Sequence, residues 1–153
     1  DGATPAWSQI TQTGGDSRGY EAFYGFGSGA IFSGGTAVFG GAAALPSLGV
    51  YGGTVTAENQ TGAIAGCSLT GGTLYYNATA TITSCVVNGG VFDARGSSGG
   101  FTQTQLEIYL SGNSAYLDPY QRTTFTNPAK LYGEPSDRLQ FGGNASVPVL
   151  IDV

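Results

Sequence analysis

One short phrase recurs four times in the first two thirds of the chain, each time around a pair of glycines. The pairs begin at Gly34, Gly52, Gly71 and Gly89, at steps of 18, 19 and 18 residues. Matching side chains flank them: Phe32, Val50, Leu69 and Val87 stand two places before, and Ala37, Val55, Leu74 and Phe92 stand two places after. A spacing this regular indicates an internal repeat, with residues 48–92 as its clearest part.

Two all-β structures explain the phrase. In the first, each glycine pair is a hairpin turn of a single-domain β-sandwich or jelly roll, because glycine readily adopts the positive φ that such turns need. In the second, each pair is a corner of a β-solenoid, and Thr36, Thr54 and Thr73 stack in a ladder. The sandwich is our main expectation, and a solenoid core built on the repeats of 18–19 residues is the alternative.

The two cysteines occupy the same place in successive phrases. Cys67 and Cys85 each stand four residues before a glycine pair. On neighbouring rungs of a solenoid they would lie about 4.8 Å apart, and a sandwich could bring them together where its two sheets approach. A flat meander would hold them about 9–10 Å apart, too far for a bond. We therefore predict an intramolecular disulfide, worth about 3 kcal/mol if it acts by restricting the unfolded chain.

The clearest strand prediction covers residues 73–87, where apolar and polar side chains alternate. The apolar face consists of Leu74, Tyr76, Ala78, Ala80, Ile82 and Val86, and the alternation breaks at Ser84. Cys85 falls on the polar face unless a bulge at Ser84 turns it inward. Asn77 falls on the polar face as well.

The two ends of the chain carry the expected assembly contacts. Residues 1–18 are polar, with Trp7 and Ile10 as their only large apolar groups, and are expected to form an exposed arm that reaches another subunit. Residues 19–153 are expected to form one all-β domain. Its last strand places Ala145, Val147, Val149, Ile151 and Val153 on one face. Pro148 lacks a backbone donor, which confines this strand to an edge of the sheet or to one-sided pairing.

The inventory of reactive and charged groups is small. The chain has no histidine, five basic and ten acidic residues, and a net charge of −5. Without histidine there is no Ser-His or Cys-His nucleophile pair and no histidine metal site. Glu21, Glu58, Asp93 and Glu107 are interpreted as solvated surface groups rather than as a pair that cleaves glycosides. We expect a protein without catalytic activity, metal or cofactor.

Charge and hydropathy also limit the partners. The few basic residues are scattered, which argues against nucleic acid, and no apolar run is long enough to span a membrane. Two cysteines, a start at Asp1 that is typical of a processed chain, and three glycosylation sequons at Asn59, Asn77 and Asn144 indicate an extracellular or cell-surface protein.

Two functions follow as hypotheses. The low charge and the abundance of Gly, Thr and Ala are similar to those of extracellular fibre subunits. We therefore expect a structural subunit of a filament, pilus-like fibre or surface layer, which binds copies of itself by strand exchange or edge pairing. The alternative is a secreted carbohydrate-binding module. Its tyrosines would stack on sugars, and the candidates are Tyr20, Tyr24, Tyr75, Tyr116 and Tyr120.

Overall fold

The computed structural model describes residues 10–12, 16–18, 29–97, 99–110, 112–133, 139–141 and 149–152. Within these ranges the chain contains sixteen strands and no helix. The strands are β1 (Ile10–Gln12), β2 (Asp16–Arg18), β3 (Ala30–Phe32), β4 (Thr36–Gly41), β5 (Leu45–Val50), β6 (Thr54–Gln60), β7 (Ile64–Leu69), β8 (Thr73–Asn77), β9 (Ile82–Asn88), β10 (Val91–Asp93), β11 (Phe101–Tyr109), β12 (Ala115–Asp118), β13 (Thr123–Phe125), β14 (Ala129–Tyr132), β15 (Leu139–Phe141) and β16 (Val149–Asp152).

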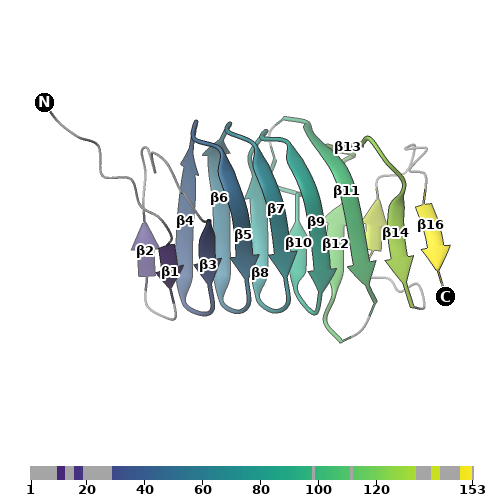
Figure 1. Cartoon of the computed structure of the whole chain (residues 1–153), viewed down its shortest axis with the longest axis horizontal. Helices are drawn as coiled ribbons and strands as arrows, with labels where there is room; N and C mark the ends of the chain where they lie inside the picture. The colour runs from purple at the N-terminus through teal and green to yellow at the C-terminus, as the bar shows by residue number, and fades with distance from the viewer. Residues whose placement is uncertain are drawn as a thin grey trace, which may run out of the picture.

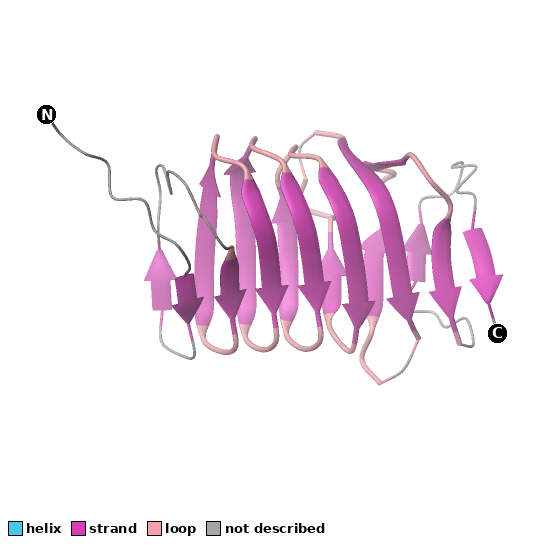
Figure 2. Cartoon of the chain, in the orientation of Figure 1, coloured by secondary structure: helices cyan, strands magenta, loops and turns pink. Residues whose placement is uncertain are grey.

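The strands stack into a two-sheet β-solenoid, shown in Figure 1. The sheet that we call sheet A has the order β1-β3-β5-β7-β9-β11-β14-β16, with β13 also paired to β11, and sheet B has the order β15-β12-β10-β8-β6-β4-β2. The chain crosses from one sheet to the other after almost every strand, and Figure 2 shows the short loops that make these crossings. The solenoid was the alternative expectation, and the sandwich or jelly roll is wrong.

The glycine pairs are corners between the sheets rather than hairpin turns. Ala37, which follows the first pair, is paired with Val55 of the next rung in a parallel ladder. At three corners the second glycine has a positive φ: 71° at Gly35, 74° at Gly53 and 68° at Gly72. A Cβ at the last of these would lie 2.6 Å from backbone atoms of the rung below. The repeat therefore needs glycine both for its conformation and for the close stacking of its corners.

The core is a set of side-chain columns that run along the solenoid between the two sheets. In sheet A one buried column is Ala30, Leu48, Cys67, Cys85 and Leu106. In sheet B the facing column is Ala37, Val55, Leu74, Phe92 and Tyr116. Parallel in-register stacking places each side chain between two like neighbours, and burying a large apolar group contributes roughly 1.5–3 kcal/mol.

The predicted strand over residues 73–87 is two strands in different sheets, β8 and β9, joined by a corner. The predicted inward face is correct from Leu74 to Ile82. Thr83 and Ser84 then both face outward, which turns Cys85 into the core. A pair of outward residues lies at the same place in the neighbouring rungs, at positions 46–47, 65–66 and 104–105. These pairs of consecutive outward residues, stacked from rung to rung, are the reason why simple alternation fails at Ser84.

Candidate functional site

Among the described residues, each end of the solenoid has strand edges that no other strand covers. At one end these are β1 in sheet A and β2 in sheet B, and at the other end β16 and β15. In the part of the chain that the structure describes, no strand pairs with the outer edge of these four. The predicted assembly residues Ile10, Val149 and Ile151 lie in β1 and β16, whereas Trp7, Val147 and Val153 lie outside the described residues.

The predicted disulfide is absent from the structure. Cys67 and Cys85 are paired directly in the parallel ladder of β7 and β9, but both are free thiols, buried in the core. In-register parallel strands hold neighbouring Cβ atoms about 4.8 Å apart, and a disulfide needs about 3.5–4.5 Å. A hydrogen bond with Cys85, together with burial, raises the pKa of Cys67 well above its usual value. The protonated, enclosed thiol is a poor nucleophile.

We therefore expect a thiol reagent to leave both cysteines unmodified in the folded protein and to modify both after denaturation without reductant. The reason is that the reagent attacks the thiolate, which burial disfavours and screens from solvent. Mass spectrometry of the labelled protein in buffer and in denaturant measures the difference. Failure of the denatured, unreduced protein to take up any label would show that the bond forms after all.

A shallow hollow of about 230 Å³ lies on the outer face of sheet A. It is lined by Ile31, Ser47, Leu48, Gly49, Tyr51, Gly66, Cys67, Ser68 and Ser84. The hollow exists because Gly49 and Gly66, which lack side chains, occupy outward positions of neighbouring rungs. The Tyr51 ring lies over Gly49, and a Cβ added to Gly49 would be 3.1 Å from the Tyr51 phenol oxygen. Tyr51 is nevertheless 48% exposed. The hollow thus combines an aromatic ring with serine side chains.

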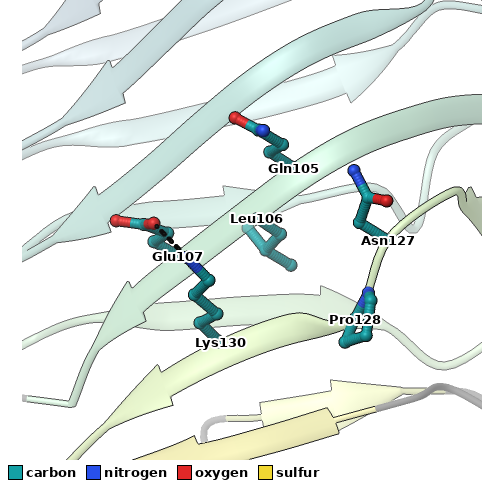
Figure 3. Close-up of a pocket in the computed structure, with 6 residues that line it drawn as sticks. All are labelled: Gln105, Leu106, Glu107, Asn127, Pro128 and Lys130. Atoms are coloured by element: carbon teal, nitrogen blue, oxygen red, sulfur yellow. Dashed lines mark hydrogen bonds and ion pairs between the residues drawn. The ribbon is translucent and has the colours of Figure 1, made fainter.

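A second hollow, of about 280 Å³, lies between β11 and β14 on the same sheet (Figure 3). Its lining residues are Gln105, Leu106, Glu107, Asn127, Pro128 and Lys130. The Lys130 ammonium donates a hydrogen bond to Glu107 Oε1 at 3.3 Å, and this contact raises the pKa of Lys130. The pair is exposed, so it adds little to stability and leaves its charges accessible. The arrangement can hold a small polar molecule.

The tyrosines predicted to bind sugars differ in their exposure to solvent. Tyr75 is 41% exposed and Tyr120 is 63% exposed, on the outside of the solenoid. Tyr116 is fully buried, so its assignment to a sugar-binding surface is wrong. Tyr116 pairs with Phe92 in an inward column of sheet B. Its strand is too short for the alternation of apolar and polar residues to show that Tyr116 faces inward. Tyr20 and Tyr24 lie outside the described residues.

Two exposed tyrosines were missed, and only one of them is placed to hold a ligand by its face. Tyr51 covers Gly49 as described above, a position that depends on the corner that follows β5. Tyr109 is stacked on Tyr132 of the neighbouring strand, with ring centroids 4.7 Å apart and an angle of 16° between the planes. Such stacking covers one face of each ring, so less of the ring surface is open to a sugar.

Several buried polar groups hold the later rungs together. The Tyr116 hydroxyl donates to Gln103 Oε1 at 3.1 Å and lies 2.9 Å from Thr123 Oγ1. The Asp118 carboxylate accepts hydrogen bonds from the backbone N–H groups of Arg122, at 2.8 Å, and Thr123, at 2.7 Å. These contacts satisfy groups that would otherwise be buried unpaired, so we assign them a structural role.

The described carboxylates considered for glycoside chemistry are distributed over both sheets. Asp93 lies in an outward column of sheet B but is only 3% exposed, so its interpretation as a solvated surface group is wrong. Arg95 pairs with it, and Arg95 Nη2 lies 2.6 Å from Asp93 Oδ2. Glu58 also lies in a strand of sheet B, whereas Glu107 faces outward in sheet A. Glu21 lies outside the described residues. Asp93 and Glu107 therefore sit on opposite outer faces and cannot flank one bond.

The sequons are placed as follows. Asn59 is exposed at the end of β6 and has a φ of 54°. Asn77 is half-buried, and its side chain lies against Gly96, where an added Cβ would meet it. Asn144 lies outside the described residues.

Metal-ligand clusters and membrane-spanning helices are absent from the described residues. Over the described ranges, no group of three or more Cys, Asp or Glu residues could hold a metal ion. In the same ranges, no helix is long and apolar enough to cross a membrane. Comparison of the chain with family models, curated proteins and solved structures finds no match.

Proposed function

We propose that the chain is a structural subunit of an extracellular filament, pilus-like fibre or surface layer, assembled from its own copies by edge pairing. The observation that supports this is the pair of strand edges at each end of a regular parallel solenoid that no described strand covers. Proteins that stay monomeric usually cover such edges or place charges on them. In β16 the sequence is Val-Leu-Ile-Asp, with Asp152 as its only charge.

The geometry of the ends suits repeated association. A contact between one end of a copy and the opposite end of the next is heterologous, so it does not close and can continue as a filament. Each added backbone hydrogen bond contributes about 0.5–1.5 kcal/mol net, and the inward columns would continue across the junction. The solenoid would then lengthen without any change in its internal packing.

The second candidate function is carbohydrate binding, and the hollow beside Tyr51 favours it. Sugars bind well to surfaces that offer an aromatic face together with hydrogen-bonding groups. The half-exposed Tyr51 ring and the side chains of Ser47, Ser68 and Ser84 provide both in one place. This site is separate from the sheet edges, so the two functions can be tested independently.

Negative-stain microscopy of the secreted protein, with a glycan array in parallel, tests both proposals. We expect filaments, and we expect Leu150→Lys in β16 to abolish them because its charge sits on the pairing edge. Thr56→Lys, in the centre of sheet B, is the matched control that should leave filaments intact. A protein that stays monomeric at high concentration while binding glycans, with that signal lost in Tyr51→Ala, would replace the filament by the sugar-binding function.

A further inference from the structure

Tyr109 and Tyr132 form a pair of tyrosines on neighbouring strands of sheet A. They are the last residues of β11 and β14, which lie side by side in Figure 1, and they are direct partners in the parallel ladder of these strands. Their rings are stacked, with centroids 4.7 Å apart. Among the described residues, no other two tyrosines are ladder partners or in ring contact.

The backbone holds the two rings beside each other. The Leu110 N–H donates a hydrogen bond to the carbonyl oxygen of Tyr132 at 2.8 Å, so the ladder continues past the pair. An in-register parallel ladder also directs both side chains to the same face of the sheet. After the hydrogen bond to Glu107, both phenol groups help to raise the pKa of Lys130. The two hydroxyl ends therefore lie near the same ammonium group.

The pair is accessible from outside the solenoid. Tyr109 is 37% exposed and Tyr132 is half-buried, whereas Tyr76 and Tyr116 are fully enclosed in the core. The two cysteines of the chain are buried as well. An oxidant in the solvent thus meets this pair of tyrosines before it meets any other pair of oxidisable side chains that are direct ladder partners in the described chain.

We propose that Tyr109 and Tyr132 are a site of oxidative cross-linking, where hydrogen peroxide and a peroxidase join the two rings as dityrosine. Each phenol loses one electron and its hydroxyl proton, which leaves two tyrosyl radicals. The radicals form a carbon–carbon bond between ring positions ortho to the hydroxyls, and the hydrogens on these carbons then move to the oxygens. One hydrogen peroxide accepts the two electrons and two protons, its O–O bond breaks, and two water molecules leave. The product has two hydrogens fewer than the protein.

The geometry favours this pair over the other exposed tyrosines. Coupling needs two rings that meet, and groups already held together react far faster than groups that must first collide. The new bond is about 1.5 Å long, so the rings close the remaining distance by rotating about their side-chain torsions while the ladder stays in place. Tyr51, Tyr75 and Tyr120 are exposed but stack on no other tyrosine in the part of the chain that the structure describes.

The cross-link would join two neighbouring strands of the stack by a covalent bond, which the buried, unpaired thiols do not do. It would close the interval from residue 109 to residue 132, which contains β12 and β13. Like a disulfide, it would restrict the unfolded chain, so the cross-linked protein should unfold at a higher denaturant concentration. The inference goes beyond the proposed function, because it depends neither on self-assembly nor on sugar binding.

Peptide mapping after oxidation tests the inference. The full-length protein, at a concentration that keeps it monomeric, is treated with hydrogen peroxide and a haem peroxidase, then denatured and digested with trypsin. Cleavage after Lys and Arg places Tyr109 in peptide 96–122 and Tyr132 in peptide 131–138. We expect these two peptides to be linked, with a mass two hydrogens below their sum. Dityrosine fluorescence should appear in the monomer band of a denaturing gel.

Three variants identify the reacting rings. Tyr109→Phe and Tyr132→Phe keep a stacked ring but lack the phenol, so each should lose the linked peptides and the rise in the denaturant midpoint. Tyr120→Phe removes the most exposed described tyrosine, which lies in the same tryptic peptide as Tyr109, and should keep both. A link that persists in Tyr109→Phe would overturn the inference. So would dityrosine confined to dimers, or no linked peptides in a reaction that couples an added free tyrosine derivative.

Discussion

Replacing Gly72 by alanine is expected to lower the free energy of unfolding by about 3–5 kcal/mol. Gly72 has a φ of 68°, where a residue with a Cβ costs about 1–2 kcal/mol. The added Cβ would also lie 2.6 Å from the carbonyl carbon of Gly52 and 2.6 Å from the carbonyl oxygen of Gly53. These are backbone atoms of the rung below, so they cannot move aside without disturbing the whole stack of corners.

Gly112 provides a matched control for this substitution. Its φ is 63°, close to that of Gly72, but an added Cβ would have nothing within 4 Å. Gly112→Ala should therefore cost only the conformational part, about 1–2 kcal/mol. Denaturant titration of both variants at a concentration that keeps the protein monomeric measures the difference. Equal losses would mean that the corners relax easily and that close stacking is not what requires glycine.

The repeat in the sequence was sufficient to propose a solenoid, but a second structure fitted the same pattern. A glycine pair between two apolar residues satisfies a hairpin turn and a solenoid corner equally well, since both need a positive φ. What separates them is the partner of each strand, and that is a long-range property. The predicted threonine ladder is confirmed, because Thr36, Thr54 and Thr73 are direct partners in successive rungs.

The cysteines show what can and what cannot be inferred from equivalent positions in the repeat. Their equivalent places in the repeat predicted that Cys67 and Cys85 would be neighbours, and they are. The disulfide did not follow, because being neighbours in a parallel ladder fixes a Cβ separation that a bond would have to shorten. The spacing of the repeat predicts the register, but not whether the two Cβ atoms approach by the further distance of about 0.3–1.3 Å that a disulfide needs.

The buried polar groups and the hollows were missed for a different reason. Gln103 occupies the inward column of Ile64 and Ile82, and its burial is evident only once the register is known. The hollow beside Tyr51 depends on Gly49 and Gly66, which leave space by lacking side chains on adjacent rungs. Both features arise from residues 17 to 21 positions apart, so no local pattern could reveal them.

The protein is also expected to lose stability steeply in alkali. Burial raises the pKa of Tyr76 and of Tyr116 above the value of about 10 that an unfolded chain shows. The Tyr76 hydroxyl donates to the carbonyl oxygen of Ala80 at 2.6 Å, so ionisation would also remove a buried donor. Because the folded-state pKa is raised, this stability is fully present below about pH 10 and falls as the pH rises toward the folded-state pKa, since only the unfolded chain releases protons there.

The expected slope above about pH 10 is near 2.7 kcal/mol of unfolding free energy per pH unit, about 1.4 for each tyrosine. The raised pKa of the Cys67 thiol adds a further loss, which begins lower, from about pH 8.5. Denaturant titrations at a series of pH values give the slope. The difference in near-ultraviolet phenolate absorbance between the wild-type protein and Tyr76→Phe or Tyr116→Phe isolates the buried rings, and this difference should appear together with unfolding. Tyr76→Phe and Tyr116→Phe should each remove about half of the tyrosine part, apart from a constant loss of about 1 kcal/mol for the missing hydrogen bond. If phenolate instead formed at Tyr76 or Tyr116 in the folded protein while stability stayed level between about pH 10 and 12, the interior between the sheets would have to be open to water, and the columns that define this solenoid could not be closed.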